Sequence, residues 1–152
     1  NSSFIRAYNL QASLLVNLKK LEEAEAACST IIAMNPMDLE AHLLLGLIHK
    51  TKNEEKDSLK SFKEAIYLKP SCWLAHFYIA EISASFGDPE NARREFEIVI
   101  KLIEKEETRD PGLTFFPISF SGEQILHLCR HKVAKLYKAG STKKERGEID
   151  GF

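Results

Sequence analysis

The sequence predicts an all-α protein built from repeated pairs of helices. Three observations lead to this prediction: side chains of similar size recur every 34 residues, apolar residues within each period follow helical spacing, and 152 residues contain only seven glycines and five prolines. Apolar residues make up 44% of the chain and charged residues 28%, which favours a folded domain over a disordered chain. No apolar run approaches the ~20 residues of a membrane-spanning helix. The net charge of -1 gives no reason to expect nucleic acid as a partner.

Cysteine usage predicts a cytoplasmic protein. Cys28, Cys72 and Cys129 are odd in number and widely spaced, and each lies among apolar residues. A disulfide-stabilised secreted domain would carry a denser and even set. The sequence shows no signal peptide or lipidation motif.

The period is visible in seven columns that agree in residue size without an insertion. They are Tyr8/His42/His76, Ala12/Gly46/Ala80, Ala24/Ser58/Ala92, Cys28/Phe62/Phe96, Ile31/Ala65/Val99, Leu45/Ile79, and the dipeptides Asn35-Pro36 and Lys69-Pro70. We therefore expect three structural units in residues 1–104, at residues 5–38, 39–72 and 73–104. The small residues in these columns would let paired helices approach closely, so that a bulky substitution there should cost ~1–3 kcal/mol.

Each unit is predicted to contain two helices joined by a short turn. In the second unit, the first helix runs from Leu39 to about Lys52 with a wide apolar face, and the second runs from about Glu55 to Leu68. Pro70 ends that helix, because its ring cannot continue the backbone hydrogen bonds. In the third unit, Gly87 permits a left-handed helix end at the turn.

These columns resemble the tetratricopeptide repeat, whose 34-residue period and Gly, Ala, Phe and Pro pattern they share. The matching residues are Leu45-Gly46, Phe62, Ala65 and Pro70 in the second unit, and Ile79-Ala80, Gly87-Asp88, Ala92 and Phe96 in the third. The first unit departs from the pattern, with Gln11 where Leu is usual and Ile31 where Ala is usual. The resemblance covers about Ile5 to Lys105 and implies an α–α superhelix, or solenoid, of three helix pairs.

The residues after the repeats are expected to close the solenoid. Residues 105–120 combine a polar linker with a phenylalanine-rich segment, which we expect to dock on the repeats or on a partner. Ser121 and Gln124 form a predicted capping box that opens a capping helix over residues 121–140, with Gly140 as its end. Residues 141–152 are polar and are expected to form a flexible tail.

The capping helix region carries an excess of positive charge. Residues 130–146 contain seven basic residues and one acid, Glu145. We interpret this excess as a solvated cap face beside an acidic repeat surface. The alternative is a docking patch for an acidic partner.

No motif for catalysis is present. The sequence lacks GxGxxG, a P-loop, GxSxG and HExxH. Glu123, His127 and His131 share a helix face and could in principle ligate zinc in a small helical hydrolase, but such groups are more often surface residues. His42 and His76 are expected to be packing residues. We expect no enzyme activity, cofactor or metal in this chain.

The resemblance also implies a binding groove, because the first helix of each tetratricopeptide unit lines the concave surface. The residues expected there are Asn9, Ser13, Leu43, Leu44, Leu47, Leu74, Phe77, Tyr78 and Glu81. Co-chaperone members of the family clamp an acidic peptide carboxylate with cationic residues at these places, and this chain lacks them. The groove is instead apolar, and we expect it to bind an apolar or helical protein segment.

The C-terminal half resembles the repeat region of CheR-type chemotaxis receptor methyltransferases. The similar segments are residues 75–80, 87–96 and 102–104, together with Ser119-Phe120-Ser121 and Leu128-Cys129-Arg130. This resemblance implies a regulatory interaction module of a protein that transfers methyl groups from S-adenosylmethionine to receptor glutamates. The catalytic domain would lie outside this chain, and chemoreceptors or other signalling proteins would be the partners. The alternative is a structural spacer or dimerisation platform whose groove is filled by its own C-terminal helix.

Overall fold

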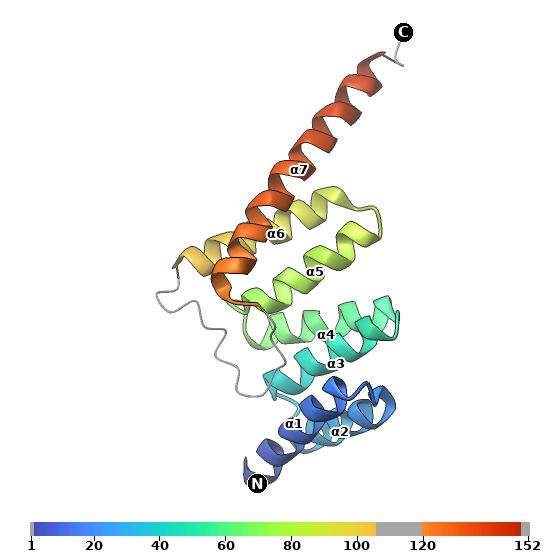
Figure 1. Cartoon of the computed structure of the whole chain (residues 1–152), viewed down its shortest axis with the longest axis vertical. Coiled ribbons are helices and arrows are strands. Elements are labelled where there is room, and N and C mark those ends of the chain that lie inside the picture. Colours follow the sequence, from blue (N-terminus) through green and yellow to red (C-terminus); the bar gives the residue numbers. More distant parts are fainter. Residues whose placement is uncertain (1, 106–119, 150–152) are drawn as a thin grey trace. The chain divides into compact units, whose positions relative to one another are not determined.

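The computed structural model describes residues 2–105 and 120–149, with side chains through residue 138 in the last helix. Seven α-helices and no β-strand are found in these residues (Figure 1). They are α1 (Ser2–Asn17), α2 (Leu21–Met34), α3 (Leu39–Thr51), α4 (Glu55–Leu68), α5 (Trp73–Ser85), α6 (Pro89–Lys105) and α7 (Gly122–Ile149). The predicted all-α fold of three helix pairs and a C-terminal helix is confirmed. Most of the expected linker and phenylalanine-rich segment, residues 106–119, lies outside the described residues.

The chain divides into two compact units, and the boundary falls in the first turn of α5, after Ala75. In the described part of the first unit, α1 packs on α2, α3 packs on α4, and α3 also packs on α2. In the second unit, α6 packs on α7, and α5 meets α6 where the Phe77 and Phe96 rings lie edge to face, 6.2 Å between centroids. The three helix pairs are therefore α1–α2, α3–α4 and α5–α6.

The repeated columns form the core of the helix pairs. Four columns of three residues are buried at every position, and all of their members with a side chain are 0% exposed. They are Ala12/Gly46/Ala80, Ala24/Ser58/Ala92, Cys28/Phe62/Phe96 and Ile31/Ala65/Val99. Residues 34 apart are thus buried alike, as the sequence predicts.

Gly46 allows α3 to lie close to α4. An added Cβ at this position would lie 2.7 Å from ring carbons of Phe62, well inside van der Waals contact. The buried hydroxyl of Ser58 donates a hydrogen bond to the Gly46 carbonyl oxygen over 2.7 Å. The absence of a side chain at Gly46 therefore sets the distance between α3 and α4.

The turns inside the pairs repeat as regularly as the core. Lys19 and Asn53 have a φ of 62°, and Gly87 has a φ of 75°. These three residues are spaced 34 apart, and each follows the first helix of its pair. The left-handed conformation that we predicted for Gly87 is therefore a property of all three turns. At Lys19 a side chain adopts it, which costs about 1–2 kcal/mol.

We expect Lys19→Gly to raise the free energy of unfolding by about 1 kcal/mol, because glycine adopts positive φ without this steric cost. Chemical denaturation monitored by circular dichroism measures the change. Lys20→Gly is the matched control, since Lys20 is equally exposed but has a φ of -86°. A gain at Lys20, or none at Lys19, would contradict this explanation of the turn.

The start of α7 confirms the predicted capping box. The Ser121 backbone N–H donates to Gln124 Oε1 over 2.9 Å, and the Gln124 N–H donates to Ser121 Oγ over 3.2 Å. The helix differs from the prediction at its other end, because it continues through Gly140 to Ile149. An interior glycine costs a helix only about 1 kcal/mol, so it need not end one.

Polar contacts as well as apolar packing attach α7 to α6. Arg93 Nη1 donates to Tyr137 Oη over 3.0 Å and to Glu97 Oε1 over 3.1 Å. Arg130 pairs with Glu104 over 2.7 Å. Cys129 is fully buried on the same helix. The N-terminal half of α7 thus covers α6, as expected of an end cap.

None of the helices in residues 2–105 and 120–149 has the length and apolar character needed to span a bilayer.

Candidate protein-binding surface

The predicted groove residues of the first unit are mostly buried. Leu43 and Leu44 on α3 are 0% exposed, and Asn9 and Ser13 on α1 are also buried. Leu47 is half-buried. Leu74, at the start of α5, is buried as well. Among these residues, Leu47 presents the most surface to a partner.

In the second unit the predicted groove residues lie in contact with one another. The Phe77 and Tyr78 rings meet edge to face with centroids 5.6 Å apart, and Phe77 is buried. Tyr78 and Glu81 are half-buried. Burial, and then the negative charge of Glu81, raise the pKa of Tyr78 to about 12, so its phenol is neutral at pH 7. A partner would meet an uncharged aromatic surface beside one carboxylate.

Asn9 has an unused acceptor in the first unit. Its Nδ2 donates to both carboxylate oxygens of Asp38 over 3.4 Å. Its Oδ1 is buried and has no hydrogen-bond partner among the described residues. A buried acceptor without a donor is costly, so a donor from a bound segment would be favourable here. The role of the nine predicted residues as a partner groove remains a prediction.

The two repeated histidines are packing residues with hydrogen bonds, as we expected. His42 Nε2 lies 2.8 Å from the Pro36 carbonyl oxygen, an acceptor, so this nitrogen carries the proton. His76 Nδ1 lies 2.6 Å from Glu95 Oε2. Both residues are buried. They join α3 to the preceding loop and α5 to α6.

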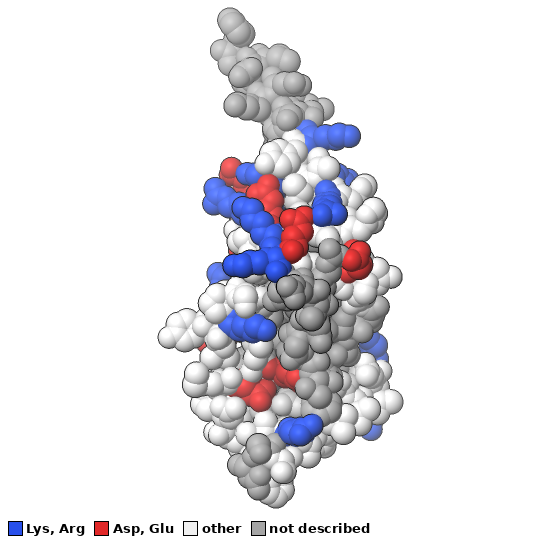
Figure 2. All heavy atoms as spheres, turned by 90° about the vertical axis from the view of Figure 1, so that its left-hand side faces the viewer, with Lys and Arg blue, Asp and Glu red and all other residues white. Residues whose placement is uncertain are grey.

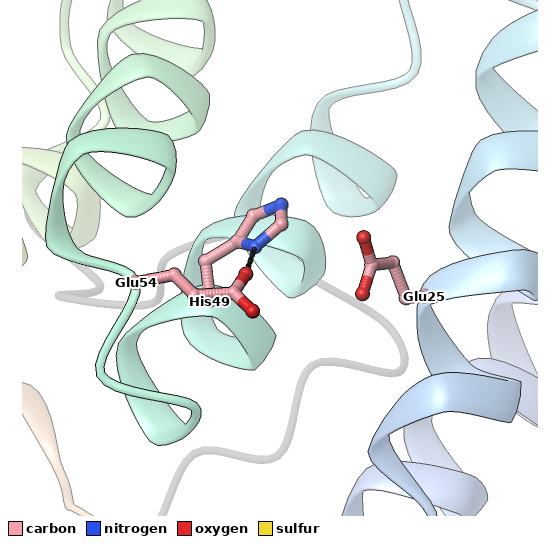
Figure 3. Close-up of side chains that lie close together, drawn as sticks. All are labelled: Glu25, His49 and Glu54. Carbon is pink, nitrogen blue, oxygen red and sulfur yellow. Dashed lines mark hydrogen bonds and ion pairs between the residues drawn. The ribbon is translucent and has the colours of Figure 1, made fainter.

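A charged cluster that the sequence did not reveal lies where α2 meets the end of α3. Figure 3 shows Glu25, His49 and Glu54, whose possible ligand atoms all lie within 4.8 Å of one another. His49 Nδ1 is 2.6 Å from Glu54 Oε2. The Lys52 ammonium lies 3.0 Å from Glu22, 2.9 Å from Glu25 and 3.1 Å from Glu54. These contacts place a cation among three carboxylates.

Lys52 gives this cluster a structural explanation. The hydrogen bonds that the Lys52 ammonium donates to Glu25, Glu22 and Glu54 raise the pKa of Lys52, so it stays charged. The hydrogen bond to His49, and then that to Lys52, lower the pKa of Glu54. A metal ion would have to displace the ammonium that already neutralises these carboxylates. We therefore assign the cluster to packing of α3 on α2.

The zinc alternative on α7 is not supported by the geometry. Glu123, His127 and His131 are exposed, and their ligand atoms do not come together as a metal-binding group in the described residues. The basic excess of the same helix is partly neutralised, because Arg130 pairs with Glu104. On the face shown in Figure 2, lysine and arginine side chains lie among acidic ones.

Two of the three buried cysteines have strongly raised pKa values. Cys28, Cys72 and Cys129 all lie in the core. Burial raises the pKa of Cys28 to about 12, with the charges of Asp38 and Glu25 adding to the effect. Burial likewise raises the pKa of Cys129 to about 12. A thiol with such a pKa is protonated at pH 7 and is not a nucleophile.

A shallow hollow of about 530 Å³ runs along one side of α4, away from the predicted groove residues. Its lining consists of Lys56, Leu59, Lys60, Lys63, Glu64 and Tyr67. Leu59, the exposed Tyr67 and the aliphatic stems of the three lysines make its lining more apolar than polar. It lies on a second helix, whereas the groove residues were predicted on the first helices.

Paired helices with a repeated core, a repeated turn and an end-capping helix define a helical-repeat protein, a class that binds other proteins. Within it, residues 9–71 match the sequence model of the tetratricopeptide repeat. This part of the chain therefore carries tetratricopeptide repeats, which confirms there the resemblance seen in the sequence.

One curated relative is a longer protein. Over 80 residues the chain is 29% identical to a protein of Pseudomonas putida named probable biofilm formation methyltransferase WspC. The match covers 53% of this chain and 19% of that protein. The matched segment therefore makes up less than a fifth of that protein.

Similar solved structures include chaperones of type III secretion. The translocator chaperone SycD of Yersinia enterocolitica has a TM-score of 0.79 at 12% identity, covering 93% of this chain and 88% of that one. PcrH, a protein of Pseudomonas aeruginosa, in complex with the chaperone binding region of PopD has a TM-score of 0.78 at 12% identity, covering 92% and 96%. At this identity the likeness shows the fold alone.

Proposed function

We propose that this chain is a non-catalytic module that binds an apolar or helical segment of a partner protein. The observation that carries the proposal is the tetratricopeptide register itself, with three helix pairs whose cores and turns repeat every 34 residues. Repeats of this kind expose first-helix side chains for recognition, and here those that remain partly accessible include Leu47 and Tyr78. The PcrH structure, which shares the fold, holds a segment of another protein. The module would need no metal or cofactor of its own.

We further propose that the module is the regulatory repeat region of a CheR-type protein-glutamate methyltransferase. The similarity to WspC supports this assignment, because that relative is named a methyltransferase and is about five times longer than the matched segment. The catalytic domain would then lie outside this chain. Chemoreceptors or associated signalling proteins would be the partners.

The alternative role is structural, with the groove filled by the chain's own last helix. In the second unit α7 packs on α6, the second helix of its pair. Its buried Cys129 also lies close enough to Glu81, a predicted groove residue on α5, for that carboxylate to raise the pKa of the thiol. The alternative therefore concerns the α5 part of the predicted groove, while Leu47 on α3 belongs to the first unit.

The groove is tested by binding to a cytoplasmic chemoreceptor fragment and to a panel of amphipathic helical peptides. We expect Tyr78→Lys and Leu47→Lys each to weaken binding at least about tenfold, because a lysine would have to be desolvated against an apolar ligand. Isothermal titration calorimetry with the full chain measures the change.

Tyr67→Lys on α4 is the matched control, since its side chain is 83% exposed and outside the predicted groove. Binding of a helical peptide without binding of the receptor fragment would support the interaction module and contradict the chemotaxis assignment. Equal binding by all folded variants would exclude the predicted groove as the site.

A further inference from the structure

A row of lysines lies along the exposed side of α4, the second helix of the middle pair. Lys56, Lys60 and Lys63 follow one another at intervals of four and three residues, which places them on one side of the helix. All three are exposed. They line the hollow of about 530 Å³ together with the half-buried Leu59 and with Tyr67, which is 83% exposed. These five residues are named here the α4 lysine face.

The lysines of this face form no ion pair with any other residue that the structure describes. Other basic side chains at the surface are paired, such as Lys52 with Glu25 and Arg130 with Glu104. Lys60 instead lies three and four positions from two further lysines, and like charges at this spacing on a helix repel one another. The arrangement therefore destabilises α4, and a negatively charged ligand would remove the repulsion.

The repeat does not require lysines at these positions. The same three columns hold other side chains in the first and third pairs. They are Glu22, Ala26 and Ser29 on α2, and Glu90, Arg94 and Glu97 on α6. Since those pairs form with different charges, packing within a pair does not explain three lysines on α4. The face also belongs to the middle pair, with a helix pair before it and another after it in the chain.

We propose that the α4 lysine face binds an acidic segment of a partner protein. The helix rises about 10 Å from Lys56 to Lys63, so carboxylates one turn apart along the side of a partner helix would match the three ammonium groups. Leu59 and Tyr67 would receive apolar side chains of the same segment. The surface lies on a second helix, and the inference does not depend on the predicted groove of the first helices.

The lining of the hollow favours a polypeptide over a nucleic acid as the ligand. It is more apolar than polar, and Glu64 lies among the lysines, where its carboxylate would repel a chain of phosphates. A nucleic-acid site is instead expected to be part of a strongly basic domain, and this chain has a net charge of -1. A segment that alternates carboxylates with apolar side chains matches both parts of the face.

Fluorescence anisotropy with the full chain tests the proposal. The probe is a labelled helical peptide with glutamates one turn apart and leucines beside them, and its control is the same peptide with glutamines in place of the glutamates. We expect the glutamine peptide to bind at least about tenfold more weakly. The difference should shrink as sodium chloride is added, because salt screens exposed charges.

Reversing the charge of the face should have a similar effect. Lys60→Glu combined with Lys63→Glu is expected to raise the Kd of the glutamate peptide at least about tenfold, because attraction becomes repulsion. Lys101→Glu combined with Lys135→Glu is the matched control, since it changes the net charge equally at two exposed lysines of α6 and α7. Circular dichroism should show both double variants folded, because the substituted side chains are exposed.

Four results would overturn the proposal. The first two are no binding of the glutamate peptide at ~0.5 mM and equal binding by the Lys60→Glu/Lys63→Glu variant. Tighter binding of single-stranded RNA would identify the face as a nucleic-acid site. Sedimentation velocity that shows a dimer of the wild-type chain, lost in the same variant, would identify a second copy as the occupant.

Tyr78→Lys separates the α4 lysine face from the predicted groove. We expect this variant to bind the glutamate peptide as the wild-type chain does, because Tyr78 lies on α5, a first helix. Loss of the peptide in Tyr78→Lys but not in the Lys60→Glu/Lys63→Glu variant would place the peptide in the groove and contradict the inference, while leaving the proposed interaction module intact.

Discussion

Replacing Phe96 with alanine is expected to lower the free energy of unfolding by about 3–5 kcal/mol. The Phe96 side chain is 0% exposed in the core of the second unit. Its ring meets that of Phe77, and the Lys132 ammonium of α7 lies 5.6 Å from its centroid. One substitution would therefore remove contacts with α5 and α7 and leave a cavity beneath the cap.

Guanidinium denaturation monitored by circular dichroism measures this loss. Phe86→Ala is the control, because a 56% exposed phenylalanine in a turn should cost within about 0.5 kcal/mol. If Phe96→Ala cost no more than this control, Phe96 would not be the packing centre of the second unit.

Gly46→Ala is expected to destabilise the chain by ~1–3 kcal/mol, although alanine favours a helix over glycine by about 1 kcal/mol. The new Cβ would lie 2.7 Å from the Phe62 ring, and Phe62 is 0% exposed and has little room to move. Helix propensity and packing thus predict opposite signs, and the short distance indicates that packing is the larger effect. The free energy of unfolding decides between them.

A double-mutant cycle with Phe62→Leu identifies the cause. The smaller leucine lacks the ring carbons that the new Cβ would meet, so Gly46→Ala should cost less in the Phe62→Leu background. An equal cost in both backgrounds would assign the loss to another neighbour. A stabilising Gly46→Ala would contradict the close approach of α3 and α4.

The core was predictable from the sequence because stacked helix pairs place the same demand on each repeat. A position such as Phe62 or Phe96 must fill the same space in its pair, so residue size recurs with the period. The capping box at Ser121 was predictable for a similar reason, since a helix end needs acceptors for its free N–H groups. The hydrogen-bonding needs of a helix end and the 34-residue period were therefore sufficient to predict the capping box and the core.

Two local features could not be predicted. The left-handed turn at Lys19 has no compositional signal, unlike those at Asn53 and Gly87, because the packing of the flanking helices imposes a conformation that lysine does not favour. The opposite error occurred at Gly140, where a residue typical of helix ends lies inside α7. At Lys19 and at Gly140 the surrounding structure outweighs the residue's own backbone preference, which amounts to about 1 kcal/mol.

The candidate site was less predictable than the fold. Helical periodicity identifies apolar positions on α3 but does not tell which of them a neighbouring helix covers, and Leu43 and Leu44 are buried where surface was expected. The contacts of Lys52 also have no counterpart in the repeat, since Phe86 occupies the same column in the third unit. A residue whose type does not recur every 34 positions, such as Lys52, cannot be recognised from the repeat.

The order of the helix contacts in the first unit has a consequence for how the chain folds. α1 packs on α2, α2 on α3, and α3 on α4, so nearly every contact joins helices that are neighbours along the polypeptide. Closing such short loops costs little chain entropy, which places the protein among the fast-folding topologies. Any one hairpin can serve as a nucleus, and order can spread from it in either direction.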